Sequence, residues 1–438
     1  MKFVFFLLFI FLGITAFSQE EIYYYQDIKG TLSLNEVKKE NFLLLEKEIK
    51  EGYGNNEVAY WFKVPAYKTS LKYIFKMVYD RYYFADAYID TIKLEKIPNQ
   101  RYLSYKFSRD NDFYIRVKPK FHSYIPVELN SLEDIIFEET NSLLINGFYY
   151  GFSILIIFLN FIYYFLFKDK VFCYYAFFQF TLCFGIFTMD GMLNYYNITG
   201  YLNELIMVIN YVSMAYFSSK FAVSYLFIDT YFPNLKKYTK FLGFCILVFA
   251  ILFLVCTNYY NLLILNILVF SLVTIYWVCG IILFNKNFYT KILVIADAII
   301  LFSAIDYFVL KFLGLSIINV DSLSIKIGAF VEMITLSFAV LYRMNVLINE
   351  NKFMKNEIIN YSKELAKSTN DNQSNKEQNL TELSKREKEI FDLIVLAKSN
   401  KEIASDLNIS INTVKFHIKN IYEKLEIKSR KEALTFKI

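Results

Sequence analysis

The sequence contains few of the residues that form metal sites and disulfides. Its 438 residues include five cysteines and two histidines. Every cysteine lies in a hydrophobic segment and none has metal-ligand spacing to a histidine, so we interpret all five as small packing residues: Cys173, Cys183, Cys245, Cys256 and Cys279. We therefore expect no metal and no cofactor, and the region before Cys173 has to fold without disulfides.

Charge is nearly absent from long stretches between residues 143 and 347, whereas 349–438 is rich in Lys, Glu, Asn and Ser. The whole chain is 56% hydrophobic, and soluble domains contain about 45–50% of such residues. This difference predicts membrane-spanning segments. Four of the five prolines precede residue 143, which fits a β-rich N-terminal domain.

Residues 1–18 have the pattern of a secretory signal peptide. Lys2 supplies the positive start, residues 3–14 are apolar, and the triplet 16–18 has the small-x-small form of a cleavage site. The apolar run is short for a membrane span, and an uncleaved anchor is the alternative interpretation. Export places the next domain outside the cytoplasmic membrane.

Residues 19–142 show the period-two alternation of strands and predict a β-sandwich or jelly-roll-like domain. The alternating sets are Val58, Tyr60, Phe62 and Val64, then Tyr73, Phe75, Met77 and Tyr79, and more loosely Tyr114, Ile115 and Val117. The many tyrosines either line a ligand surface or, more commonly, pack within the sheets. His122 has no obvious partner and no catalytic constellation is present, so we do not expect an enzyme.

Seven apolar segments follow, each near the about 20 residues that a helix needs to cross a bilayer. They are 143–167, 171–188, 202–220, 241–257, 262–284, 292–313 and 323–347. An exported N-terminus makes the first loop between them cytoplasmic. The three loops on that side contain seven basic residues: Lys168, Lys170, Lys236, Lys237, Lys240, Lys286 and Lys291.

The opposite turns have far less positive charge. Turns 189–201 and 258–261 contain no basic residue, the third contains only Lys311, and Lys326 lies just inside the next segment. Because basic loops stay in the cytoplasm, we predict a multi-pass protein of the bacterial inner membrane. Its N-terminal domain lies outside and its C-terminal domain is cytoplasmic.

Three ionisable residues within these segments are candidates for function, because buried charge is costly in a membrane. Asp297 and Asp306 lie in the sixth segment and Glu332 lies in the seventh. Asp306 and Glu332 fall at similar depth and could share a proton or a cation. The favoured alternative is that Asn, Tyr or Ser neighbours bond to them and fix helix packing.

Beyond the seventh segment a set of mostly apolar residues continues with the alternating spacing of three and four that is typical of a coiled coil. They are Met344, Leu347, Asn351, Met354, Ile358, Tyr361 and Leu365, and a buried Asn at such a position favours two strands. We therefore predict a dimeric signalling helix over 344–365, with a solvated amphipathic helix as the alternative. The polar residues 366–379 are expected to be a flexible linker that spans about 20 Å.

Residues 380–438 predict an all-α helix-turn-helix domain. Ser384 and Glu387 form a capping box before a helix that ends near 397. Helices at 401–407 and 411–425 follow, the latter capped by Ser410, and Ser429 with Glu432 begins a short fourth helix. The domain contains 12 Lys or Arg and 9 Asp or Glu, so its net charge is modest and a single copy should bind weakly.

The third of these helices has two distinct faces at 100° per residue. Its inward residues are Val414, Ile418, Ile421 and Leu425, and its outward residues are Asn412, Lys415, Phe416 and Lys419. Lysine can donate to guanine and Phe416 can touch a thymine methyl group. Thr413, Asn400 and Lys401 are better placed for phosphates, and we interpret His417 as a packing or backbone-bonded residue.

Two family resemblances agree with this layout. Gly328, Glu332, Ser337 and Arg343 resemble the last helix of the seven-transmembrane receptors with diverse intracellular signalling modules, a family whose sensor domains imply a small-molecule or carbohydrate ligand. The motifs LSKRE, SNKEIA and TVK-x-H, with R-x-EA after them, closely resemble the LuxR-type helix-turn-helix domain. In that family the residues matching Lys415, Phe416 and Lys419 face the DNA groove, and the fourth helix contributes to dimerisation.

The combined interpretation is a membrane-embedded one-component regulator that senses an envelope signal and binds DNA. The expected partners are double-stranded DNA, the cytoplasmic membrane, a second copy of the chain, an unknown ligand and RNA polymerase. Two alternatives remain. A protease releases the DNA-binding domain from the membrane, or the protein is transporter-like with a vestigial tail.

Overall fold

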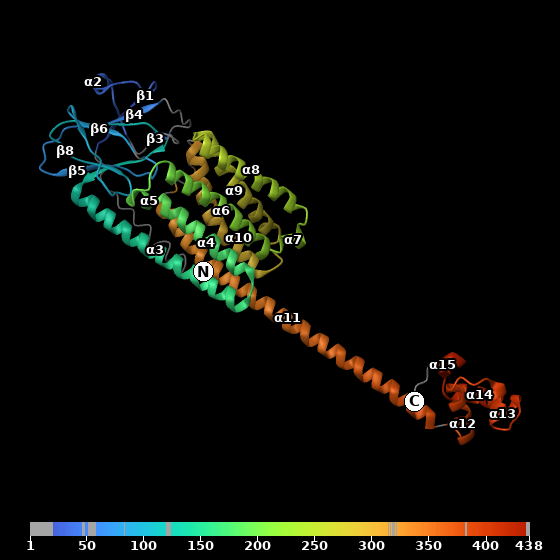
Figure 1. Cartoon of the computed structure of the whole chain (residues 1–438). Helices are drawn as coiled ribbons and strands as arrows, with labels where there is room; N and C mark the ends of the chain where they lie inside the picture. The colour runs from blue at the N-terminus through green and yellow to red at the C-terminus, as the bar shows by residue number, and fades with distance from the viewer. Residues whose placement is uncertain are drawn as a thin grey trace. The chain divides into compact units, whose positions relative to one another are not determined.

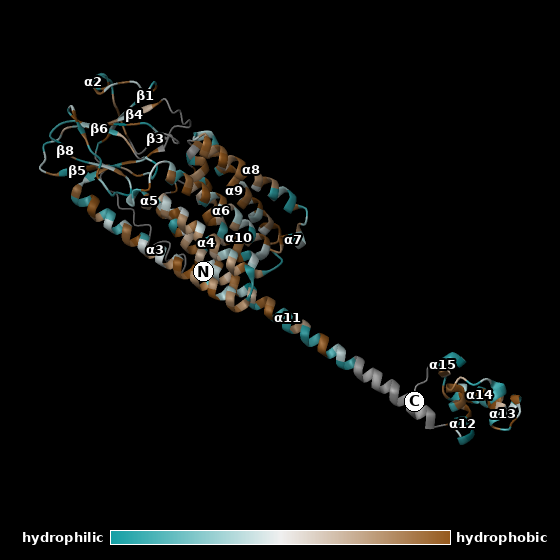
Figure 2. Ribbon diagram, in the orientation of Figure 1, coloured by the Kyte–Doolittle hydropathy of each residue, from teal (hydrophilic) through white to brown (hydrophobic). Residues whose placement is uncertain are grey.

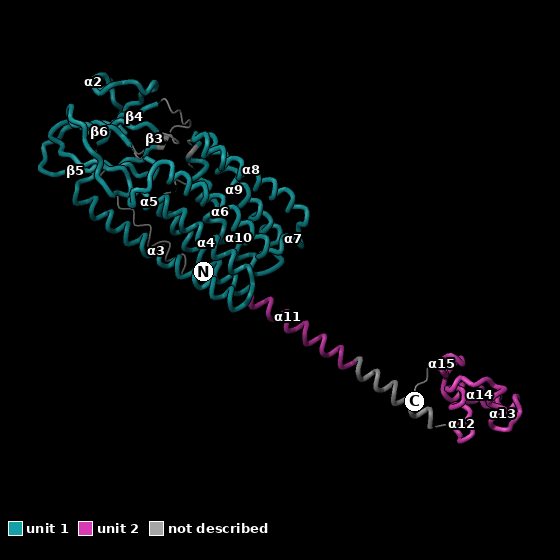
Figure 3. Tube along the Cα trace, in the orientation of Figure 1, with its two compact units in different colours: residues 1–343 teal, residues 344–438 magenta. Residues whose placement is uncertain are grey.

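The computed structural model describes residues 21–434, except 46–48, 51–57, 83, 120–123, 314, 316, 318–319, 321 and 382. The expected signal peptide at 1–18 and His122 lie outside the described residues. The chain divides into two compact units, residues 1–343 and 344–438, which Figure 3 draws in teal and magenta. Each unit is described separately below.

The N-terminal domain consists of antiparallel strands, as the alternation predicts (Figure 1). One sheet has the order β2-β1-β4-β9-β6-β7, a second has the order β11-β5-β8, and β10 pairs with β3. The strands are β1 (Tyr23–Asp27), β2 (Leu43–Leu44), β3 (Ile49–Lys50), β4 (Ala59–Val64), β5 (Lys72–Met77), β6 (Asp86–Ile89), β7 (Ile92–Leu94), β8 (Leu103–Ser108), β9 (Phe113–Val117), β10 (Tyr124–Ile125) and β11 (Val127–Ser131).

The core of this domain lies between the two larger sheets. Tyr60, Phe62 and Val64 of β4 share one buried cluster with Phe75 and Met77 of β5. The first two predicted sets and the sandwich are therefore confirmed, whereas Tyr114 of the third set was wrongly grouped with Ile115 and Val117, because neighbouring residues of a strand face opposite sides. The other side of β4 is buried too, because Trp61 and Tyr114 pack against Val37 of the short helix α2 (Leu34–Val37).

Seven of the described helices are long and apolar enough to cross a membrane, in agreement with the seven predicted segments. They are α3 (Leu132–Phe167), α4 (Lys170–Met189), α6 (Tyr201–Tyr225), α8 (Leu235–Val255), α9 (Tyr259–Ile282), α10 (Phe288–Ile305) and α11 (Ser322–Thr381). A π-turn at Asp306–Leu310 extends α10. Short helices α5 (Met192–Tyr195) and α7 (Ile228–Tyr231) follow α4 and α6. Figure 2 shows hydrophobic residues in brown along these helices.

Two predicted boundaries differ from the structure. α3 begins at Leu132 and not near 143, because Ser131 caps it by accepting the backbone N–H of Asp134. The stretch 366–379, expected to be a linker, is helical, since α11 continues to Thr381. No glycine or proline follows Gly328 within α11, so nothing in the sequence terminates this helix earlier.

The C-terminal domain has the four predicted helices: α12 (Lys385–Val395), α13 (Asn400–Asp406), α14 (Ile411–Lys424) and α15 (Arg430–Leu434). Capping boxes start both α12, at Ser384, and α13, at Ser399. The core contains Ile390, Ile394, Ile403, Val414 and Ile421, none of which is exposed.

Glu387 links two of these helices. Its carboxylate accepts the backbone N–H of Ser384, and Lys424 at the end of α14 donates to it at 2.8 Å. The pKa of Glu387 falls to about 2, because the hydrogen bonds from Lys424 and Ser384 favour the charged form.

We predict that Glu387→Gln lowers the free energy of unfolding of the 383–434 segment by about 1–2 kcal/mol at pH 7. A depressed carboxyl pKa adds stability above the unfolded value of 4.5, and this contribution is lost as the pH falls toward about 2. The difference between wild type and variant should therefore shrink over that interval in urea titrations. Glu389→Gln, which breaks only the exposed pair with Arg386, is the control and should change stability by less than about 0.5 kcal/mol.

Candidate functional site

Helix α14 separates its two faces as the sequence predicts. Val414 and Ile421 are fully buried and Leu425 is 3% exposed, while Ile418 packs at the edge of the same core. On the opposite face Asn412, Lys415, Phe416 and Lys419 are exposed. We call the side chains of Lys415, Phe416 and Lys419 the α14 face.

The α14 face is available to a ligand. Phe416 is 62% exposed, so its ring is accessible on this face. Lys415 makes no ion pair with any residue that the structure describes, and Lys419 approaches only the exposed Glu423, at 3.8 Å. His417 lies beside Phe416 with a ring separation of 5.8 Å, which agrees with packing.

The three residues predicted to contact phosphates differ in the contacts that their side chains make. Lys401 is exposed, and the Thr413 hydroxyl is 2.8 Å from that of Ser410 at the cap of α14. Asn400 differs, because its side-chain oxygen accepts a hydrogen bond from Arg430 at 2.9 Å. Arg430 also donates to the backbone oxygen of Lys398, so it attaches α15 to the start of α13. In the sequence, only the R-x-EA motif had singled out Arg430, which attaches α15 to the start of α13.

The structure gives Asp306 and Glu332 separate partners. The carboxylate of Asp306 accepts the backbone N–H groups of Ile317 and Val320 at 2.9 and 3.3 Å. Gln179 of α4 donates to both oxygens of Glu332 at 3.0 and 2.9 Å. These contacts favour helix packing over a shared proton or cation.

Asp297 faces a cavity of about 120 Å³ inside the helical bundle. The cavity is bounded by α4, α6, α9, α10 and the start of α11, and its walls are mostly apolar. Tyr79, Asp80 and Arg81 of the N-terminal domain contribute to its lining. The cavity therefore lies where the β domain meets the helices.

Comparison with known families agrees with both parts of the chain. The family of bacterial regulatory proteins called the luxR family matches residues 381–436, and the 7TM diverse intracellular signalling family matches residues 142–343. The spore germination protein GerE of Bacillus subtilis (strain 168) is 52% identical over 52 residues, which are 12% of this chain and 70% of GerE. The chain belongs to the LuxR family of bacterial regulatory proteins.

Other relatives share only the DNA-binding domain of this LuxR-family protein. The putative HTH-type transcriptional regulator YhjB of Escherichia coli (strain K12) is 45% identical over 56 residues, 13% of this chain and 28% of YhjB. The transcriptional regulatory protein DesR of Bacillus subtilis (strain 168) is 49% identical over 53 residues, 12% of this chain and 27% of DesR. The chain thus spans less than a third of the length of these two relatives. No solved structure matches it.

In the LuxR-family protein, one buried carboxylate joins the β domain to the 7TM domain. Asp190, directly after α4, is 1% exposed. Its oxygens accept hydrogen bonds from Tyr150 of α3 at 2.5 Å and from Ser322 of α11 at 2.8 Å, and Lys326 of α11 pairs with it at 2.8 Å. We call Asp190 and these three partners the Asp190 junction.

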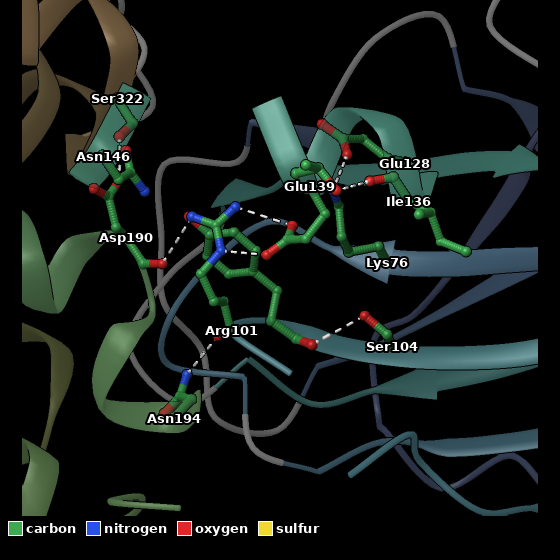
Figure 4. Close-up of polar contacts among 12 residues, drawn as sticks. Lys76, Arg101, Ser104, Glu128, Ile136, Glu139, Asn146, Asp190, Asn194 and Ser322 are labelled. Carbon is green, nitrogen blue, oxygen red and sulfur yellow. Dashed lines mark hydrogen bonds and ion pairs between the residues drawn. The ribbon is translucent and has the colours of Figure 1, made fainter. Parts of the chain in front are cut away.

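Arg101 of the β domain completes the connection. It donates to the backbone oxygen of Asp190 at 3.4 Å and to both oxygens of Glu139 in α3, as Figure 4 shows. Gly191 adopts φ +72°, and a Cβ atom there would lie 2.2 Å from the backbone oxygen of Arg101. Only glycine allows this approach.

We predict that Lys415→Ala and Lys419→Ala each weaken specific DNA binding by about 1–3 kcal/mol, because each removes a donor to a base edge. Fluorescence anisotropy at fixed salt measures this on a duplex selected by the wild-type protein. Lys388→Ala is the matched control, since it removes a charge that is also exposed but lies on α12. Equal losses for all three variants would mean that net charge, and not the α14 face, determines affinity.

We predict that Asp190→Asn destabilises the membrane part by about 3–5 kcal/mol, because it leaves the buried ammonium group of Lys326 without its counter-charge. Thermal unfolding in lipid nanodiscs measures the change. Asp86→Asn breaks the exposed pair with Lys93 and should cost at most about 1 kcal/mol. Identical unfolding temperatures for both variants would contradict a structural role of the junction.

Proposed function

We propose that this protein is a membrane-embedded one-component transcription regulator that binds double-stranded DNA through the α14 face. The proposal rests on one observation, which is that a single helix leads from the membrane part to the DNA-binding domain. α11 begins at the Asp190 junction and continues as one helix to Thr381, next to the DNA-binding domain. A change at the membrane thus has a direct mechanical route toward the DNA-binding helices.

The loop charges support an orientation with the β domain outside and the DNA-binding domain in the cytoplasm. The basic residues cluster at the connections between α3 and α4, α6 and α8, and α9 and α10. Lys168 and Lys286 lie between helices, and the other five lie in the first two turns of α4, α8 and α10. These connections share one side of the membrane, and basic loops remain cytoplasmic. In this orientation α11 leaves the bilayer on the side where the chromosome is.

The signal enters, in this proposal, at the β domain or at the cavity beneath it. A small molecule or carbohydrate bound to the β domain would act on Arg101, whose contacts reach α3 and the end of α4. A ligand of the cavity would touch Tyr79, Asp80 and Arg81 on one side and Ile325 of α11 on the other. Both routes converge on the first turns of α11.

The output requires two copies of the DNA-binding domain. Met354, Ile358 and Tyr361 of the predicted heptad are 51%, 65% and 64% exposed in the single chain. Leu347 is half-buried, Asn351 is exposed, and the side chain of Leu365 lies outside the described part. An apolar row of this kind on a solvated helix is the pattern that a second helix covers in a coiled coil. RNA polymerase is the expected further partner of the assembled dimer.

We predict that fusing residues 344–438 to a constitutively dimeric protein raises affinity for a duplex with two half-sites by at least about 100-fold over the monomeric segment. Binding of the first domain makes binding of the second intramolecular. Electrophoretic mobility shift at fixed salt measures both. A duplex with one half-site is the control and should show no such gain. If dimer and monomer bind the two half-sites equally weakly, dimerisation does not control the output.

The alternative of proteolytic release differs from a tethered regulator in the cell fraction that contains the DNA-binding domain. Release predicts a soluble C-terminal fragment in fractionated cells, whereas a tethered regulator stays in the membrane fraction. A transporter-like protein with a vestigial tail predicts that Lys415→Ala and Lys419→Ala leave gene expression unchanged. The exposed α14 face supports a working DNA-binding domain over a vestigial one.

A further inference from the structure

Lys220 is an exposed lysine within a membrane-spanning helix. It lies in the last two turns of α6, and its ammonium group is 5.5 Å from the ring centre of Tyr216. Lys220 forms no ion pair with any residue in the described parts of the chain. A charged group in a span is costly unless it pairs with an opposite charge or reaches the interface. Lys220 lies five residues before the end of α6, so its ammonium group can reach the interface, where an anion from outside this chain can pair with it.

Two further lysines share a groove with Lys220. The groove has a volume of about 710 Å³ and is bounded by α6, α7, α8 and α9. Lys236 and Lys240 lie one turn apart at the start of α8 and line the same groove. The acidic lining residue is Asp229, which is 3.7 Å from Lys236. The polar end of the groove thus has an excess of two positive charges.

The rest of the groove is apolar. Its walls include Val212, Ala215, Val223, Ile246, Leu247 and Leu272. Phe244 and Leu247 of α8 are 63% and 49% exposed, on a helix long and apolar enough to span the bilayer. Such surfaces face hydrocarbon in a membrane. Figure 2 shows the change from hydrophobic to hydrophilic colouring at the end of α8 next to α7.

We propose that this groove binds one anionic phospholipid, with an acyl chain along α6 and α8 and the phosphodiester head group on Lys220, Lys236 and Lys240. A basic pocket between spanning helices is suited to an anionic lipid head group. A zwitterionic lipid does not match the net positive charge. The proposal depends on membrane insertion alone and is independent of DNA binding.

The position of the groove connects it to α11. Lys220 precedes Ser224 and Tyr225, whose backbone oxygens accept hydrogen bonds from Arg343 at 3.1 and 3.2 Å. A lipid on Lys220 therefore holds the end of α6 that also holds the seventh spanning helix. Lipid composition is then an input to the same helix that leads to the DNA-binding domain.

The test uses the full-length protein in nanodiscs of phosphatidylcholine with a minor fraction of phosphatidylglycerol, and native mass spectrometry counts the lipids that remain bound. The wild type should retain one phosphatidylglycerol per chain in preference to phosphatidylcholine. In the triple variant K220Q/K236Q/K240Q, the ratio of bound phosphatidylglycerol to bound phosphatidylcholine should fall by at least about five-fold for each lysine removed. K168Q/K170Q/K291Q, which removes three lysines that do not line the groove, is the control and should retain the preference.

A second variant tests the apolar part and leaves all lysines in place. Gly243 lines the groove, and a Cβ atom there would meet nothing within 4 Å, so Gly243→Phe introduces a ring into the groove at an open position. It should abolish lipid retention, while Gly147→Phe, at an equally open glycine of α3, should not. If the triple variant does not insert into the membrane, the comparison of Gly243→Phe with Gly147→Phe tests the proposal instead. Wild-type retention in both variants, or displacement of the lipid by soluble glycerol phosphate, would overturn the proposal.

Discussion

The buried carboxylate of Asp190 is the interaction on which the membrane part depends. A charge that is 1% exposed is stable only when its oxygens are hydrogen-bonded and its charge is paired. Lys326, Ser322 and Tyr150 meet that requirement, and they come from α11 and α3. The backbone of the same residue receives Arg101. One group thus fixes the β domain, the first two spanning helices and the seventh relative to each other.

α11 is anchored at several further points between residues 322 and 343. In the middle, Gln179 of α4 bonds Glu332, and the hydroxyl of Tyr175 donates to the backbone oxygen of Met333. At the far end Arg343 pairs with Asp169 at 2.9 Å and is 3% exposed. A helix transmits displacement along its axis because its hydrogen bonds are internal. Movement of α11 at Ser322 along the helix axis would therefore strain or break the contacts of Glu332 and Arg343.

Features set by local periodicity were predictable from the sequence, and features set by long-range contacts were not. Val414 and Ile421 repeat at helical spacing, and Phe62 and Val64 alternate as strand residues do, so the α14 face and the β4 core followed from pattern. The polar composition of 366–379 led to the wrong prediction of a flexible linker, because a helix that has begun continues until a residue ends it.

The Asp190 junction could not be predicted from the sequence, for a different reason. Its members come from positions 101, 150, 190, 322 and 326, and no local rule relates such distant residues. The groove with Lys220 has the same origin, since Lys236 and Lys240 join it only after α7 reverses the chain. The loop lysines had been assigned to topology alone. Their second role as a cluster appears only in three dimensions.

Two features of the DNA-binding domain support the proposal that a second copy takes part in binding. α15 is five residues long, and Arg430 at its start is engaged within the domain by Asn400 and Lys398. Helix α15 is thus attached to the start of α13, while Lys431, Glu432 and Leu434 of α15 remain exposed. The α14 face offers two lysines and one aromatic ring, and few phosphate contacts mean weak binding by one domain. The exposed heptad on α11 is the remaining apolar surface of this unit that repeats at coiled-coil spacing among the described residues. In the proposed dimer, pairing through α11 would bring two such domains together, and it would do so in the same helix that the membrane contacts hold.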